Sequence, residues 1–203
     1  MITIRRAAAA DLPFITKVMN HYIATSTCTF HLEPRTPEDY AVWFRDRTDI
    51  HPVTVAELDS DPAGFAYLSP WRPREAYRRS VEGSVYVHPE RHRCGVGRAL
   101  LADLIERARS LGHRSLIGGT CTEVEASLAL QRALGFTTVG VLKDVGYKFG
   151  RWLDVEHTQF DAVARRTRTT HSRGEFGHRD VATARLPAPP VTAGSATGGR
   201  ETG

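Results

Sequence analysis

The sequence lacks the marks of a membrane-spanning, secreted or disulfide-rich protein. No apolar run approaches the roughly 18 residues that a membrane-spanning helix needs, and the N-terminal segment 1–6 has no apolar signal core. The three cysteines, Cys28, Cys94 and Cys121, include no C-x-x-C pair, which argues against a disulfide framework and a structural zinc site. We therefore expect a cytoplasmic protein with reduced thiols, no bound metal and no membrane partner.

What is present is enough for one folded domain followed by a tail of different composition. The chain has 203 residues, of which 41% are hydrophobic and 25% are charged. Residues 164–203 are rich in Arg, Thr, Gly, Ala and Pro and hold seven Arg against three acidic residues, so residues 1–163 carry 20 basic and 20 acidic residues. The net charge of +4 thus belongs to the tail. We expect a disordered tail and a neutral domain over 1–163, with nucleic-acid binding by the tail as the less favoured alternative.

Strand and helix patterns alternate along residues 1–163, which predicts an α/β domain. Helices are indicated where capping residues precede apolar residues at helical spacing, and strands where short runs of β-branched and aromatic residues occur. The strands are expected at 3–5, 53–58, 64–68, 81–87, 115–118, 139–142 and 152–160, and the helices at 11–23, 36–44, 96–111 and 127–134. The segment Asp59-Ser60-Asp61-Pro62 predicts a hairpin turn.

The segment from Val85 to Leu101 carries the clearest functional signal. It reads as a strand, a basic turn with glycines at 95 and 97, and a long amphipathic helix. Glycine lets the backbone approach a ligand, and the first N–H groups of a helix attract anions. Arginines at 91, 93 and 98 add charge around the turn. The pattern therefore indicates a site for a phosphate group.

Several other interpretations of this segment are weaker. The Walker A pattern is absent, and a dinucleotide fingerprint starting at Gly95 would require glycine where Leu100 stands. An ordinary strand-to-helix turn, in which the glycines only ease the bend, remains open. A nucleophilic role for Cys94 is disfavoured because that residue lies at the expected phosphate position.

The segment resembles motif A of the GNAT acetyltransferases. The resemblance covers roughly residues 2–162 and is strongest to phosphinothricin and methionine sulfoximine acetyltransferases, through segments such as 70–77, 81–87, 133–136 and 146–155. It implies a GNAT fold, with a mixed, mostly antiparallel twisted sheet flanked by helices on both faces, and a homodimer. It also implies acetyl-CoA as co-substrate and two central strands that splay apart.

The resemblance implies a set of residues for acetyl-CoA. These are Val85, Tyr86, Val87, Arg93, Cys94, Gly95, Val96, Gly97, Arg98 and Ser127. Two positions depart from the family pattern. His92 stands where Gln or Arg is usual, and Val124 stands where phosphinothricin acetyltransferases carry Asn.

Direct acetyl transfer needs a base for the ammonium, a donor for the oxyanion and an acid for the thiolate. The resemblance assigns the base to Glu82, which begins the strand leading to the turn, acting directly or through a water. The oxyanion donor is expected to be a backbone N–H near Tyr86 or Val87. The chemistry of a phenol makes Tyr147 the candidate acid.

The acceptor is expected to be a small amino-acid-like amine. Arg72 and Arg74 are candidates to bind its carboxylate or phosphinate, and Tyr22, Thr27 and Phe30 are candidates for the pocket wall. Alternatives are a protein N-terminus, a polyamine, which the two arginines would repel, or a non-catalytic acyl-CoA-binding module.

Overall fold

The computed structural model of the chain describes residues 1–163, so the expected disorder of residues 164–203 lies outside the described residues. The elements of the described part follow in chain order. They are β1 (Ile2–Arg6), η1 (Ala9–Asp11), α1 (Leu12–Thr25), α2 (Pro37–Arg45), β2 (Val53–Leu58), β3 (Asp61–Pro70), η2 (Glu75–Tyr77), β4 (Ser80–Val87), η3 (Pro89–Arg91), α3 (Val96–Ser110), β5 (Ser115–Cys121), α4 (Glu125–Ala133), β6 (Thr137–Lys148) and β7 (Arg151–Asp161). No helix among them has the length and apolarity that a bilayer crossing requires.

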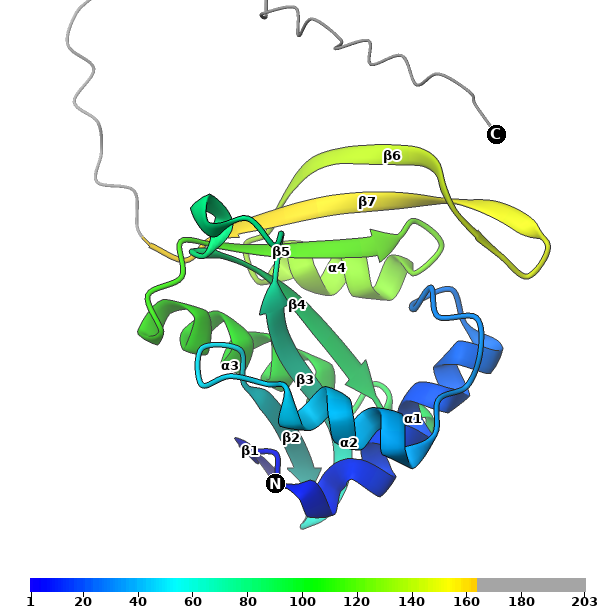
Figure 1. Cartoon of the computed structure of the whole chain (residues 1–203), viewed down its shortest axis with the longest axis vertical. Helices are drawn as coiled ribbons and strands as arrows, with labels where there is room; N and C mark the ends of the chain where they lie inside the picture. Colours follow the sequence, from blue (N-terminus) through cyan, green and yellow to red (C-terminus); the bar gives the residue numbers. More distant parts are fainter. Residues whose placement is uncertain (164–203) are drawn as a thin grey trace, which may run out of the picture. The chain divides into compact units, whose positions relative to one another are not determined.

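The strands form one seven-stranded sheet in the order β1-β2-β3-β4-β5-β7-β6 (Figure 1). The pair β4–β5 is parallel, and the other five neighbouring pairs are antiparallel. The expected mixed, mostly antiparallel α/β fold is therefore confirmed.

The two central strands separate partway along their length. β4 and β5 pair only where Ser80–Glu82 meets Ser115–Ile117, although β4 continues to Val87 and β5 to Cys121. Figure 1 shows the two ribbons diverging beyond this point. The splay that the resemblance implies is present, and beyond Glu82 this edge of β4 has no strand partner within residues 1–163.

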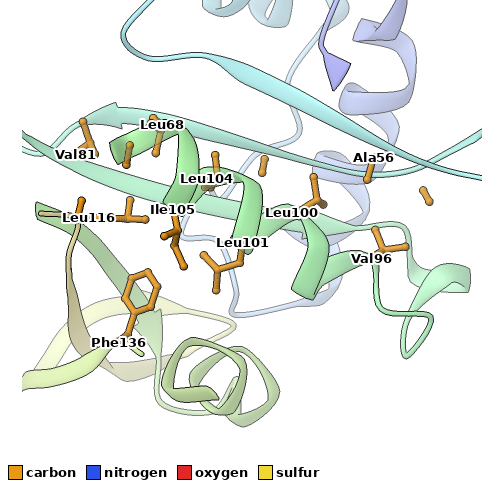
Figure 2. Packing of buried hydrophobic residues seen from close by; sticks show 14 residues of the cluster. Ala56, Leu68, Val81, Val96, Leu100, Leu101, Leu104, Ile105, Leu116 and Phe136 are labelled. Carbon is orange, nitrogen blue, oxygen red and sulfur yellow. The ribbon is translucent and has the colours of Figure 1, made fainter. Parts of the chain in front are cut away.

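Apolar side chains pack on both faces of the sheet. On one face, Leu100 and Leu104 of α3 are fully buried against Leu68, Val81 and Leu116 of the strands (Figure 2). Burying a leucine side chain stabilises a fold by about 2 kcal/mol. The other face packs α1 and α2 against β2 and β3 through a second cluster. The first cluster fixes the start of α3 beside the end of β4.

The element boundaries differ from expectation at the hairpin and at two later elements. The turn between β2 and β3 consists of Asp59 and Ser60, with φ of 53° and 76°, the backbone that two-residue hairpins require. Asp61 and Pro62, expected in the turn, belong to β3. Helix α4 begins at Glu125, and β6 extends over 12 residues because β7 pairs with it as far as Lys148.

Candidate active site

The start of α3 presents backbone donors that the helix itself does not use. Gly95 precedes the helix with φ of 83°, a left-handed conformation that glycine adopts without strain. The first intrahelical bond runs from Ala99 N–H to the Gly95 carbonyl at 3.0 Å, so the preceding first-turn amides have no acceptor in the helix. The first turn holds no acidic residue. This end of the helix dipole therefore favours an anion.

The start of α3 lines a groove of about 540 Å³, which we call the α3 groove. Its lining combines the helix start, the end of β4, the loop after α1 and the start of α4. The lining residues are Tyr22, Ser26, Cys28, Val85, Tyr86, Val87, Arg91, His92, Arg93, Gly95, Gly97, Arg98, Val124, Ala126, Ser127 and Leu130. The set includes most of the residues that the resemblance assigned to acetyl-CoA. It also includes His92 and Val124, the two residues that differ from the family pattern.

Of the three arginines that line the α3 groove, only Arg91 has a carboxylate partner among residues 1–163. Arg91 lies 3.6 Å from Asp61, an exposed pair. Arg93 and Arg98 form no ion pair with any residue of the described part of the chain. A guanidinium group that has no carboxylate partner can donate two parallel hydrogen bonds to the oxygens of one phosphate.

Tyr22 lies in the α3 groove, not in the acceptor pocket where sequence analysis expected it. Its hydroxyl donates to the Val87 carbonyl at 2.6 Å and lies 2.7 Å from His92 Nε2. Because the hydroxyl has one proton, His92 must donate to the Tyr22 oxygen. Burial raises the pKa of Tyr22 to about 12. Tyr22 thus fixes the end of β4 and orients His92.

Along β4, the backbone N–H and C=O groups of successive residues point alternately to the two edges of the strand. His88 N–H donates to the carbonyl of Ala63 in β3, and the Ser80 carbonyl accepts from the N–H of Trp71, which directly follows β3. The register of β4 with β3 is continuous between these points. The even-numbered residues therefore bond to β3, and the N–H groups of Val85 and Val87 point to the splayed edge.

A second cavity, of about 460 Å³, lies over the sheet face on which Glu82 stands; we call it the Glu82 cavity. Side chains of β3, β4, β5 and β7 form its floor, and the loop after α1 forms a wall. The lining residues are Thr29, Phe30, His31, Tyr67, Ser69, Glu82, Ser84, Tyr86, Gly119, Cys121, Val155 and His157. Burial raises the pKa of the Glu82 carboxyl, and the positive charge of Arg72 opposes the shift.

Tyr86 lines both cavities. Its ring stacks on Phe65 with centroids 5.3 Å apart and tilts against Tyr22 at 6.1 Å. Burial holds the pKa of its hydroxyl well above the usual range of tyrosine, so the hydroxyl stays protonated. Tyr86 is thus the residue that the linings of the α3 groove and the Glu82 cavity share.

The structure brings some expected acceptor residues to the Glu82 cavity and not others. Phe30 lines it, and Arg72, stacked on Trp71 at 4.6 Å, is near enough for its charge to act on Glu82. Thr27 donates to Glu123 at 3.3 Å and lines a different cavity. Arg74 is exposed at the start of η2 and lines neither cavity.

Three other expected residues also lie outside both linings, and one of them, Val96, is buried in the core. Tyr147, the candidate acid, is 54% exposed on β6 and packs edge-on against Trp152 at 5.2 Å. Cys94 is exposed, and its thiol donates to the His92 carbonyl at 3.4 Å. Neither side chain lines the α3 groove or the Glu82 cavity.

Sequence reasoning did not identify Lys148 and His157 as site residues. Lys148 is buried, and its ammonium donates to the carbonyls of Ser26 at 2.7 Å and Thr29 at 2.8 Å. It thereby attaches β6 to the loop that borders both cavities. His157 enters the Glu82 cavity from β7. The contacts of Lys148 join residues 122 and 119 positions apart, so no local pattern indicates them.

Comparison with known proteins agrees with this arrangement. A model of the Acetyltransferase (GNAT) family matches residues 16–136. The chain belongs to this family, and it is an acetyl-CoA-dependent N-acetyltransferase.

Three relatives place it more narrowly. The L-methionine sulfoximine/L-methionine sulfone acetyltransferase of Salmonella typhimurium is 36% identical over 159 residues, covering 78% of this chain and 93% of that protein. The structure of a GNAT superfamily phosphinothricin acetyltransferase from Sinorhizobium meliloti in complex with acetyl-CoA has a TM-score of 0.76 and 38% identity, covering 79% and 88%. That of a ribosomal-protein-alanine N-acetyltransferase from Brucella melitensis has a TM-score of 0.77 and 40% identity, covering 78% and 99%.

Proposed function

We propose that the chain acetylates the α-amine of a small amino-acid-like acceptor of the phosphinothricin or methionine sulfoximine type, with Glu82 supplying the base. The observation that carries the proposal is the junction at Tyr86. There, a groove with free helix amides and unpaired arginines meets a cavity that holds a desolvated carboxylate.

The residues of the α3 groove suit acetyl-CoA. The amides at the start of α3, with Arg93 and Arg98, match a diphosphate in charge and in hydrogen-bonding capacity. The N–H groups on the splayed edge of β4 suit an arm that carries amide carbonyls. When bound, acetyl-CoA supplies an activated thioester that an amine can attack.

The chain's own groups can meet the remaining needs of the reaction. Glu82 takes a proton from the acceptor's ammonium, because desolvation makes its carboxylate a better proton acceptor than in water. The N–H of Val85 or Val87 stabilises the negative charge that develops on the carbonyl oxygen. For the leaving thiolate, Tyr86 is better placed than Tyr147, because Tyr86 lines both cavities and Tyr147 lines neither.

The Glu82 cavity supports a small acceptor. Arg72 places a cation near the carboxylate that takes the proton, which suits an acceptor carrying its own anionic group and disfavours a polyamine. A protein N-terminus is the second candidate acceptor, because one structural relative is a ribosomal-protein-alanine N-acetyltransferase.

A thiol-release assay with acetyl-CoA tests the proposal. The panel contains phosphinothricin, methionine sulfoximine, methionine sulfone, spermidine and a short peptide beginning with alanine. We expect turnover with the first three and little with spermidine or the peptide. Turnover confined to the peptide would assign the second candidate function, and no turnover with any acceptor would reject the proposal.

We also propose that the chain forms a homodimer through the β6–β7 hairpin. Large apolar side chains of both strands are exposed, including Val139 at 64% and Trp152 at 62%, and exposed apolar surface of this kind favours association. Light scattering after gel filtration should give twice the chain mass, and Val139→Glu should halve it. A monomeric parent would contradict this proposal.

A further inference from the structure

His157 faces Glu82 across a position that has no side chain. The register pairs Gly119 of β5 directly with His157 of β7. The imidazole Cε1 and Nδ1 lie 3.5 Å and 3.7 Å from the point where a Cβ on Gly119 would stand, and Glu82 Oε1 lies 3.3 Å from the same point. The carboxylate and the imidazole therefore flank one small volume on the floor of the Glu82 cavity.

The ring of His157 is held in place but lacks hydrogen bonds. Trp71 packs edge-on against it, with centroids 5.5 Å apart and an interplanar angle of 78°. Nδ1 is buried and has no hydrogen-bond partner among residues 1–163, and Nε2 is not among the buried unpaired atoms. A buried polar atom without a partner is unfavourable and uncommon. The arrangement is explained if the ring acts on a ligand together with Glu82.

Resting on the proposed function, we propose that His157 and Glu82 form a catalytic pair in which the imidazole takes the acceptor's proton. One N–H bond of the ammonium breaks, and the proton joins Nε2. The imidazolium then releases its Nδ1 proton to the Glu82 carboxylate, so Glu82 takes the acceptor's proton through the imidazole and not from the ammonium directly. The neutral amine keeps the electron pair with which it attacks the thioester.

Two chemical reasons favour the pair over Glu82 alone. An imidazole is ordinarily a stronger base than a carboxylate, so it is better matched to an ammonium. A carboxylate beside the ring stabilises the cation that forms. Other titratable groups border the same cavity from every side. They are Tyr67 from β3, Glu82 and Tyr86 from β4, Cys121 from β5, and His31 from the loop after α1.

The test compares two substitutions at His157. His157→Phe keeps a ring against Trp71 but has no nitrogen, and His157→Ala leaves a space beside Gly119 that free imidazole can enter. We expect kcat to fall at least tenfold in both, with the KM of the acceptor and the binding of acetyl-CoA changed less than threefold. Added imidazole should restore activity to His157→Ala and not to His157→Phe, and substituted imidazoles should restore it in the order of their basicity.

A third variant, Gly119→Ala, tests the inference even if the His157 variants do not fold. The backbone of Gly119 is not left-handed, so Gly119→Ala is compatible with the strand, but its Cβ would stand between the two groups. We expect it to lower kcat while both side chains remain. Gly140→Ala is the matched control, because a Cβ there meets nothing within 4 Å.

The outcomes separate this inference from the proposed function. Parent-like kcat in His157→Phe overturns the inference, as does parent-like kcat in Gly119→Ala if the His157 variants do not fold. Failure of imidazole to restore activity to a folded His157→Ala that binds acetyl-CoA also overturns it. A parent chain that acetylates none of the acceptors rejects the proposed function, and this inference with it.

Discussion

The hydroxyl of Tyr22 donates to the carbonyl of Val87 at 2.6 Å and so connects helix α1 to the last residue of β4. The same hydroxyl contacts His92, which stands in the turn before α3. The Tyr22 side chain thereby sets the position of the β4 edge relative to the turn before α3. These are the two parts of the chain that a ligand of the α3 groove must contact together.

Replacing this hydroxyl should loosen the α3 groove. In Tyr22→Phe, the Val87 carbonyl and His92 lose their partner, so we expect a loss of about 1–2 kcal/mol in the free energy of unfolding and a higher KM for acetyl-CoA. Urea unfolding and steady-state kinetics measure the two effects. Tyr77→Phe, at an exposed tyrosine in η2, is the control. An unchanged KM for acetyl-CoA would show that the contact is not part of the groove.

Removing the charge of Glu82 should abolish activity without weakening the fold. We expect Glu82→Gln to lower kcat by about 10²–10⁴-fold, with acetyl-CoA binding by calorimetry nearly intact. Because the pKa of Glu82 is raised in the folded state, the native chain binds more protons than the unfolded chain just above the usual carboxyl pKa. Stability contributed by this group therefore falls as pH rises, and Glu82→Gln should be as stable as the parent or more stable at neutral pH. A strongly destabilised variant would indicate a structural role instead.

The raised pKa of Glu82 also predicts the pH dependence of catalysis. The reaction needs the carboxylate in its ionised form, so kcat/KM should rise with pH through an apparent pKa above that of a free glutamate. Glu82→Gln should lose this dependence. The residual activity of Glu82→Gln, measured at a series of pH values in buffers of constant ionic strength, provides the check.

The arginines at the start of α3 should bind the coenzyme through their positive charge. We expect Arg93→Ala and Arg98→Ala each to raise the Kd for coenzyme A by about tenfold, the equivalent of about 1.4 kcal/mol. Added salt should weaken binding less in either variant than in the parent. Arg45→Ala, at an exposed arginine of α2, is the control and should bind as the parent does. If Arg93→Ala and Arg98→Ala both bind coenzyme A as tightly as the parent, the phosphate does not bind at this position.

Lys148 should govern the loop that borders both cavities. Lys148→Met removes the donor to the carbonyls of Ser26 and Thr29, and we expect it to cost about 1–3 kcal/mol of stability. We also expect it to raise the KM for both substrates. Lys143→Met, at an exposed lysine of the same strand, is the control. If the two lysine variants have equal KM values, the loop does not depend on this anchor.

Local patterns predict the α/β class and the phosphate site at the start of α3, whereas the mixed, mostly antiparallel sheet was expected from the resemblance. The apolar spacing of α3 and the glycines at 95 and 97 lie within one continuous segment, so the turn and its charge can be inferred before any contact is known. The position of Glu82 rests on the resemblance. Its neighbours in space, Gly119 and His157, come from two other strands, and their pairing depends on a register that no single segment encodes.

The same reason explains where the predicted residues and the structure differ. Tyr22 follows the apolar spacing of α1, but which cavity it enters depends on how α1 packs against β4. Tyr147 has suitable chemistry, yet β6 is an edge strand and presents it to solvent beside Trp152. Tyr86 was expected through its backbone, whereas the structure places it in the linings of both cavities.

A crystal structure of the chain with coenzyme A and methionine sulfoximine tests the account most directly. It should show the diphosphate on the amides of Gly95–Arg98 between the side chains of Arg93 and Arg98, the coenzyme arm along the free edge of β4, and the acceptor amine beside Glu82. A diphosphate bound elsewhere, or an acceptor amine outside the Glu82 cavity, would contradict it.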